Sequence, residues 1–349
     1  MRSIYPKFVG EFKCKAAACT DNCCIGWEIG IDDKTLKLYK TQNSPLDKRI
    51  RENIKEGEDG AVFKLGRNGR CPFLDECGLC DIIKEKGEVA IPEICREHPR
   101  YYNVLSDRVE WGIGLSCEEA ARLILNCADI RVEKPGNIDC APQDGDNALL
   151  AFLTDARGEF YKILYDSELP IRERLAALIY YAEVVDTCIE NRDFGKIYPV
   201  MPLILPKKRD TGWGFGDFSR VLAFLSEMDF MDGNFKKRIE EVADNGGMLP
   251  PLTKDSEALI LRLVAYFLHR YLITALWDFV TVSKVKFAVV SALVILSLCG
   301  ESTDEKDFIN AAKAYSKEME YNEDNRELFF DGCFTEKELS SENILTVLI

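Results

Sequence analysis

Hydrophobic and polar positions change their period along the chain. In the first third, apolar and polar side chains alternate over short stretches such as Trp27–Ile31 and Asp107–Leu115, which is the pattern of strands. An Asn-Gly turn dipeptide separates Val62–Leu65 from Arg70–Leu74, so these segments are predicted to pair as a hairpin. Tyr5–Lys13 is predicted to be extended. Short helices are expected over residues 33–40, 46–56, 81–87 and 92–97.

The period changes to that of amphipathic helices after a segment rich in proline and glycine. This segment, Asp129–Gly145, is predicted to be a linker, and Pro199–Gly216 a second loop. We therefore expect a mainly α (α+β) fold with two domains. A cysteine-rich metal or iron–sulfur domain with short strands covers residues 1–130, and an all-helical domain covers residues 146–349. The expected helices of the latter are 147–164, 169–191, 215–228, 234–244, 254–278, 284–298, 305–321 and 322–329.

Composition and charge narrow the class of protein. The chain has 349 residues, of which 47% are hydrophobic and 30% charged, as in ordinary soluble domains. A net charge of −14 argues against a nucleic-acid partner, because phosphate binders usually carry a basic patch. The most apolar run, Phe287–Leu298, is too short to be a transmembrane segment and is predicted to be a buried helix, although peripheral membrane contact stays open. Met1–Gly10 lacks the apolar core of a signal peptide, so we expect a cytoplasmic location.

The 14 cysteines are unevenly distributed. Eleven lie between Cys14 and Cys140, whereas three follow far apart in the helical region. In a reducing compartment, clustered thiols indicate metal binding or redox chemistry rather than disulfides. Thiolates are soft ligands that select zinc, copper(I) or iron–sulfur clusters, and four suffice for one [4Fe–4S] cluster or one structural zinc. The spacing therefore indicates a metal centre without deciding which metal.

Individual positions differ in how well they suit a metal. Cys117 falls in the first turn of a helix predicted over residues 117–127, where the helix dipole stabilises a thiolate by up to about 1 kcal/mol. Trp27 is expected to pack as a lid over the centre, and Arg100 to contact it or to form a surface ion pair. His98, three residues after Cys95, is expected to be a loop residue, with a role as a ligand as the alternative. Ordinary core thiols are expected at Cys127, Cys140, Cys188, Cys299 and Cys333.

Other motifs give no competing assignment. The chain contains no Gly-x-Gly-x-x-Gly after a strand and no phosphate-binding Walker loop. With only two histidines, His98 and His269, histidine-based catalysis has few candidates. His269 lies in an apolar helical stretch and is predicted to be a core or interface residue.

The cysteine motifs occur in a specific order over roughly the first 125 residues. They are Cys19-x3-Cys23-Cys24-x2-Trp27, Cys71-Pro72-Phe73-Leu74, Leu79-Cys80, Cys95-x3-Pro99-Arg100 and Leu115-Ser116-Cys117-x-Glu119-Ala120-x-Arg122. This set resembles the flagellin lysine-N-methylase family, which shares its pattern with the broader cysteine-cluster, zinc- or iron-chelating proteins. Two positions depart from the family. Cys77 stands where an acidic residue or glycine is usual, and Glu118 stands where proline is usual.

The resemblance implies an enzyme that methylates lysine ε-amines of flagellin, or of another lysine-bearing protein, with S-adenosylmethionine as methyl donor. It also implies a cysteine-bound [4Fe–4S] cluster, with zinc as the alternative. Eight thiols exceed the need of one centre, so which four bind stays open. The implied ligand set is Cys14, Cys19, Cys23, Cys24, Cys71, Cys80, Cys95 and Cys117.

Two further functions are compatible with the same residues. The first is a non-enzymatic metal-binding protein with a helical partner-binding domain, and the second is a metal sensor or chaperone. Methyl transfer needs a neutral amine, whereas a free lysine has a pKa near 10.4, so an enzyme must desolvate the substrate or supply a base. The sequence does not place that base. It also lacks the Cys-x3-Cys-x2-Cys loop of radical S-adenosylmethionine enzymes.

Overall fold

The chain packs as two compact units. The computed structural model describes residues 1–20, 22–57, 60–195, 215–247, 249–302 and 304–348. The smaller unit combines Phe12–Tyr101 with Cys117–Glu119, and the larger unit combines Met1–Glu11, Tyr102–Ser116 and Ala120–Ile349. The loop predicted at residues 199–216 falls almost wholly outside the described residues. The predicted domain limits at residues 130 and 146 stay a prediction.

The smaller unit is built on a three-stranded antiparallel sheet with the order β2-β4-β3. Short helices surround the sheet, and two of them begin at polar N-cap residues. The Asp32 side chain accepts a hydrogen bond from the Thr35 amide at 2.9 Å, and Ser44 forms a capping box with Asp47. Ile50 and Phe73 are fully buried in its core. Its elements are β2 (Gly30–Ile31), α1 (Asp33–Thr41), α2 (Pro45–Glu52), β3 (Ile54–Gly57), β4 (Gly60–Phe63), α3 (Asp81–Lys86) and α4 (Glu93–Glu97).

The predicted hairpin of Val62–Leu65 with Arg70–Leu74 is wrong. β4 pairs instead with β3, because α2 ends at Glu52 and Ile54 turns back to pack on the core. The predicted turn does form: Asn68 and Gly69 both have positive φ, and the Gly66 amide donates to the Arg70 carbonyl at 2.7 Å. After the turn, Arg70 forms a single bridge with Ile25 rather than a ladder with β4.

A four-stranded sheet opens the larger unit, in the order β5-β6-β1-β7. β1 (Arg2–Pro6) runs parallel to β6 (Val109–Ile113) and antiparallel to β7 (Glu133–Asn137), and β5 (Arg100–Val104) lies on the far side of β6. The predicted linker Asp129–Gly145 therefore contains a strand. Pro135 is tolerated there because β7 is an edge strand, paired on one side. The extended prediction for Tyr5–Lys13 holds only to Pro6, since Lys7–Glu11 is a 3-10 turn.

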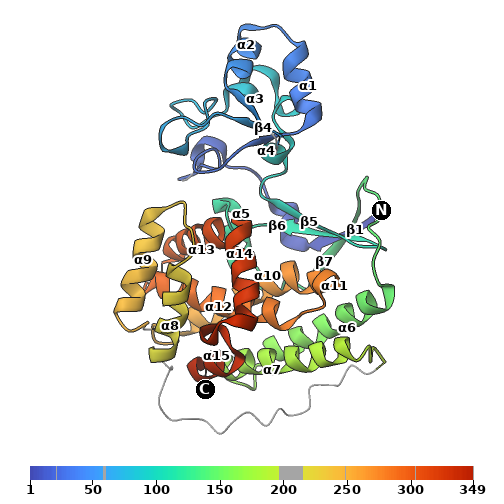
Figure 1. Ribbon diagram of the computed structural model, residues 1–349, viewed down its shortest axis with the longest axis vertical. Coiled ribbons are helices and arrows are strands. Elements are labelled where there is room, and N and C mark those ends of the chain that lie inside the picture. Colours follow the sequence, from blue (N-terminus) through green and yellow to red (C-terminus); the bar gives the residue numbers. More distant parts are fainter. Residues whose placement is uncertain (21, 58–59, 196–214, 248, 303, 349) are drawn as a thin grey trace. The chain divides into compact units, whose positions relative to one another are not determined.

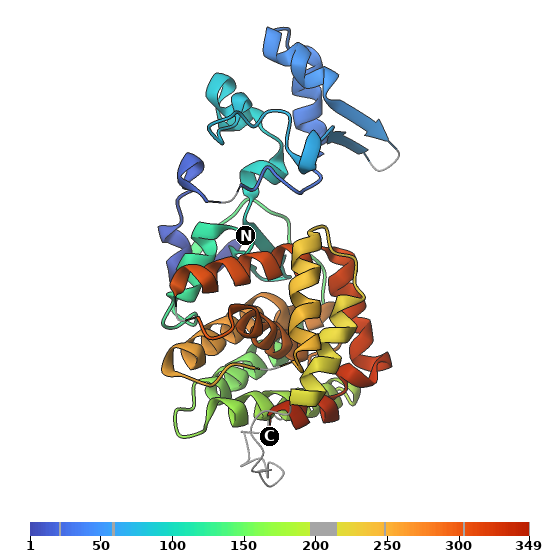
Figure 2. The same cartoon turned by 90° about the vertical axis from the view of Figure 1, so that its left-hand side faces the viewer.

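Helices make up the rest of the larger unit, with α12 at its centre (Figure 1). Every side chain of α12 from Val282 to Leu298 is buried, and α12 packs against α7, α9, α10, α13 and α14. In the turned view, α8 and α9 lie side by side (Figure 2). α5 (Glu118–Leu125) belongs to this unit from Ala120 onward. The other helices are α6 (Asn147–Leu164), α7 (Ile171–Glu190), α8 (Phe215–Ser226), α9 (Gly233–Asp244), α10 (Lys254–Tyr271), α11 (Ala275–Asp278), α12 (Val282–Cys299), α13 (Glu305–Met319), α14 (Glu323–Thr335) and α15 (Ser341–Leu348).

The mainly α (α+β) fold class is confirmed, with differences at the ends of elements. The helix predicted over residues 254–278 is interrupted by a 3-10 turn at Leu272–Thr274, and α15 was not predicted. The segments Lys254–Asp278 and Val282–Cys299 are long and apolar enough to cross a membrane. Because 83% of each apolar window is buried inside the protein, they have the burial of core helices, as expected for Phe287–Leu298.

Candidate metal centre

Four cysteines of the predicted ligand set reach one hydrophobic core. Cys71 is buried in the core of the smaller unit at 6% exposure. Cys24, Cys80 and Cys95 are half-buried and pack against the same core. We call these four residues the inner thiols. They come from four separate segments of the chain, which is how a loop-rich domain gathers ligands for one ion.

Backbone hydrogen bonds hold three of these segments together. The Cys71 amide donates to the Cys24 carbonyl at 2.9 Å, next to the bridge between Ile25 and Arg70. A second bridge joins Leu74 to Cys80, which is also the N-cap residue of α3. Cys95 lies in the single turn of α4, where its amide donates to the Pro92 carbonyl at 3.0 Å. The fold thus fixes the backbones of the inner thiols.

A second set of thiols lies at the beginning of the smaller unit. Cys14 and Cys23 are exposed and Cys19 is half-buried. Burial raises the pKa of Cys19, and the nearby Glu118 carboxylate and the Cys14 and Cys23 thiol groups raise it further, so these groups are close in space. Cys23 also hydrogen-bonds through its side chain to Cys24. Cys23 therefore links the outer thiols, Cys14 and Cys19, to the inner thiols.

Glu118 ties this first segment to the turn that carries Cys117. Its carboxylate accepts hydrogen bonds from Lys15 Nζ at 2.7 Å, from the Thr20 amide at 2.8 Å and from Thr20 Oγ1 at 2.5 Å. Burial acts to raise the pKa of Glu118, but the hydrogen bonds from Lys15 and Thr20 outweigh burial and lower that pKa to about 2. An ionised carboxylate therefore clamps the loop of Cys14 and Cys19 next to Cys117. We call these contacts the Glu118 clamp.

The Glu118 clamp leads to a prediction. Exchanging Glu118 for glutamine keeps its size but removes the charge that holds Lys15 and the Thr20 amide. We expect the variant to bind metal about 10- to 100-fold more weakly, as is typical when a residue that orients ligands is lost. Competition with a chelator measures this affinity. Glu76→Gln, at an exposed position in the same unit, is the control and should leave the affinity unchanged; equal affinities in both variants would contradict the role of the clamp.

The raised pKa values of the inner thiols are those expected of thiols that ionise when they bind a metal cation. Burial, followed by the neighbouring thiols, raises the pKa of Cys95 to about 12, and burial raises the pKa of Cys71 to about 11. Such thiols stay protonated by themselves at pH 7, whereas a bound metal ion deprotonates them. The donor set therefore fits zinc or an iron–sulfur cluster. Across the described residues, no three His, Cys, Asp or Glu side chains already converge as metal ligands, so the thiols are gathered but not in coordination geometry.

The remaining sequence candidates lie in varied places. Cys77 is exposed in a turn that Asp75 closes by accepting the amides of Cys77 and Leu79 at 2.8 Å. Trp27 stands edge-on to His98, with ring centroids 6.3 Å apart. The Arg100 guanidinium lies over the Phe12 ring at 5.8 Å. Cys188 and Cys333 are buried, as expected of core thiols, whereas three others are only half-buried: Cys127, Cys140 and Cys299.

The role of Glu118 was not predicted. Sequence alone showed it only as a departure from proline at the start of a helix. Its partner Thr20 is 98 residues away along the chain, and no local pattern connects the two positions. The only available signal was the unexpected acidic residue beside a cysteine.

Comparison with known proteins also indicates a metal-binding domain in the cysteine-rich part of the chain. Residues 13–119 match the family model CxxCxxCC, a zinc- or iron-chelating domain. The flagellar biosynthetic protein FliU of Salmonella muenchen is 35% identical over 130 residues, which cover 36% of this chain and 77% of that protein. The lysine-N-methylases of Salmonella typhimurium LT2 and Salmonella choleraesuis SC-B67 are each 32% identical over 130 residues, which cover 36% of this chain and 32% of theirs. No solved structure matches.

The cysteine-rich unit and these matches define the class. This is a protein with a cysteine-cluster, metal-chelating domain. The chain belongs to the lysine-N-methylase family, as its motifs predicted. The chain spans about a third of the length of the lysine-N-methylases that it matches.

Proposed function

We propose that this protein is a lysine N-methyltransferase that acts on flagellin in the cytoplasm and uses S-adenosylmethionine as methyl donor. The observation that carries the proposal is the shared core of the inner thiols, which lie in the part of the chain that matches the metal-chelating family. Relatives named lysine-N-methylase and flagellar biosynthetic protein support the reaction and a flagellar substrate.

The metal proposed for this centre is a [4Fe–4S] cluster held by Cys24, Cys71, Cys80 and Cys95. Four thiolates complete the ligand set of such a cluster, which supplies one-electron chemistry or structural support when bound. The outer thiols and Cys117, held together by the Glu118 clamp, border this centre or hold a second ion. The zinc alternative uses the same donors, since structural zinc also takes four thiolates.

The test begins with anaerobic purification. We expect brown protein with about four irons per chain, whereas a colourless protein with one zinc would replace the cluster by a structural site. The same preparation is then incubated with S-adenosylmethionine carrying a labelled methyl group and with flagellin. We expect label on flagellin lysines, located by peptide mass spectrometry. Absence of label from metal-loaded protein would refute the methyltransferase.

A second function is favoured by one observation. The matches to lysine-N-methylases extend over 130 residues of this chain, so the similarity in sequence does not carry the methylase activity to the helices beyond them. This fits a non-enzymatic metal-binding protein whose helical unit binds a partner. Calorimetry separates the two functions, because the enzyme must bind S-adenosylmethionine and the binding protein need not.

A further inference from the structure

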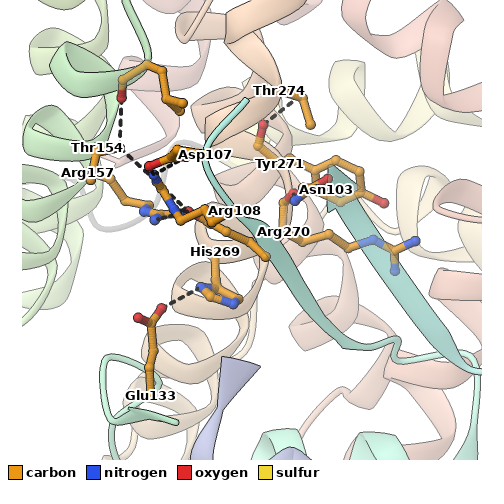
Figure 3. Close-up of polar contacts among 12 residues, drawn as sticks. Asn103, Asp107, Arg108, Glu133, Thr154, Arg157, His269, Arg270, Tyr271 and Thr274 are labelled. Atoms are coloured by element: carbon orange, nitrogen blue, oxygen red, sulfur yellow. Dashed lines mark hydrogen bonds and ion pairs between the residues drawn. The ribbon is translucent and has the colours of Figure 1, made fainter. Parts of the chain in front are cut away.

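A buried ion-pair cluster lies in the larger unit, where Arg108 and Glu110, from the end of the segment matched by the metal-chelating domain, meet Arg157 beyond it (Figure 3). Glu110 of β6 is 1% exposed, and its carboxylate accepts hydrogen bonds from both terminal nitrogens of Arg157 of α6, at 2.5 and 2.9 Å. Arg108 Nε donates to Glu110 at 2.8 Å, and the other nitrogens of Arg108 donate to Asp107 and Thr154. The strong donors of this cluster are therefore already engaged.

Three side chains beside this cluster have acceptor atoms that receive no hydrogen bond from the described residues. His269 of α10 is 2% exposed, and its Nε2 has no hydrogen-bond partner among the described residues. Tyr161 is 8% exposed, and its hydroxyl likewise has no hydrogen-bond partner among the residues that the structure describes. Glu133 of β7 lies with Oε1 3.9 Å from His269 Nδ1, which is beyond hydrogen-bonding distance. Buried polar atoms without partners are costly, so this arrangement points to a ligand.

The strand register explains why these groups meet. On β1, Ile4 pairs with Glu110 and Pro6 pairs with Glu133, so both carboxylates lie on the same face of the sheet. His269 reaches this face from α10, whereas the adjacent Arg270 points away to another set of residues (Figure 3). The Glu133 side chain is 31% exposed, so the cluster opens to solvent at Glu133 and closes at His269.

The chemistry of the spare atoms selects the ligand. Burial lowers the pKa of His269 to about 4, so its imidazole is neutral at pH 7, and with Nδ1–H directed toward Glu133 its Nε2 is an acceptor. Burial also raises the pKa of Glu133. A primary amine or ammonium group suits a carboxylate, an imidazole lone pair and a phenol oxygen, because it carries several N–H donors on one atom.

We propose that Glu133, His269 and Tyr161 form a binding site for a primary alkylammonium group, such as the end of a lysine side chain. The inference rests on the proposed function, under which the bound group is the ε-amine of the substrate lysine. Arg2, Arg108 and Arg157 oppose a further positive charge here, whereas Asp107, Glu110 and Glu133 favour it. Desolvation and the three arginines act to lower the pKa of a bound amine, whereas the three carboxylates act to raise it, and methyl transfer needs the neutral form.

The test uses the two histidines of the chain as probes. Imidazole nitrogens are labelled with ¹⁵N, and His98→Asn assigns the two sets of signals. Titration with n-butylamine at neutral pH is expected to shift His269 in a saturable way and to leave His98 unchanged, whereas n-butanol shifts neither. Glu133→Gln should weaken butylamine binding by about tenfold or more, since it removes a charge-assisted contact. Lys134→Gln is the matched control on the opposite face of β7 and should bind as the unmodified protein does.

The outcomes separate this inference from the function on which it rests. No shift of His269, a shift of both histidines, or binding that survives Glu133→Gln would overturn the amine site even if flagellin is methylated. Conversely, a selective shift of His269 without any methylation would keep the amine site and refute the methyltransferase. Unchanged amide spectra of Glu133→Gln show that the variant is folded.

Discussion

Protein carrying Cys95→Ser is expected to emerge from anaerobic purification with less than about a tenth of the metal of the unmodified protein. Serine is a hard ligand whose hydroxyl does not ionise as a thiol does, so one corner of a four-thiolate site is lost. Cys95 is preferred to Cys71 for this experiment because Cys95 is half-buried. A hydroxyl at the buried position of Cys71 would disturb the core by itself.

The matched control is Cys77→Ser. Cys77 lies in the same unit, but it is exposed in the turn that Asp75 closes, and it stands outside the inner thiols. Its metal content should stay within error of the unmodified protein. Metal analysis and the visible absorption spectrum measure both variants. Equal loss in the two variants would mean that thiols in general, rather than the inner thiols, govern retention.

Glu110→Gln is expected to destabilise the larger unit by about 3–5 kcal/mol. The exchange preserves shape but leaves Arg108 and Arg157, both at most 8% exposed, without their buried counter-charge. Thermal unfolding should shift downward by roughly 10 °C. Asp107→Asn removes another partner of Arg108, yet Asp107 is 59% exposed, so its effect should stay within about 0.5 kcal/mol. Similar losses in the two variants would contradict a special role of the buried pair.

The same pair predicts a dependence of stability on pH. Burial would raise the pKa of Glu110, but Arg157 and Arg108 lower it to about 2 from an ordinary value of 4.5. The stability from this carboxylate is therefore complete above pH 4.5 and is lost as the pH falls through about 2, amounting to about 3 kcal/mol. Urea unfolding between pH 2 and 6 measures the loss, and Glu110→Gln should flatten the curve.

Sequence patterns predicted the features that depend on neighbours along the chain. Helices such as α1 and α6 begin at capping residues and show a clear period, so their ends agree with prediction within a few residues. The Asn68-Gly69 turn formed for the same local reason. The order of the cysteine motifs along the chain also predicted the family, because that order is itself the signal.

The features that could not be predicted depend on partners distant in sequence. β7 contains Pro135 and Gly136 and is recognisable as a strand only once β1 lies beside it. The contact between Glu118 and Thr20 spans 98 residues. Likewise, the position of His269 next to Glu133 could not be predicted, because Glu133 comes from a segment predicted to be a linker. An apolar helical pattern could only place this histidine in the interior.

The pairing of β1 between β6 and β7 affects how the protein is made. Residues 2–6 form β1 and belong to a sheet whose other strands are synthesised more than 90 residues later, after most of the cysteine-rich unit. β1 therefore lacks both of its partner strands, β6 and β7, while most of the cysteine-rich unit is being synthesised. Deleting residues 2–6 would consequently separate β6 from β7 and damage the sheet of the larger unit.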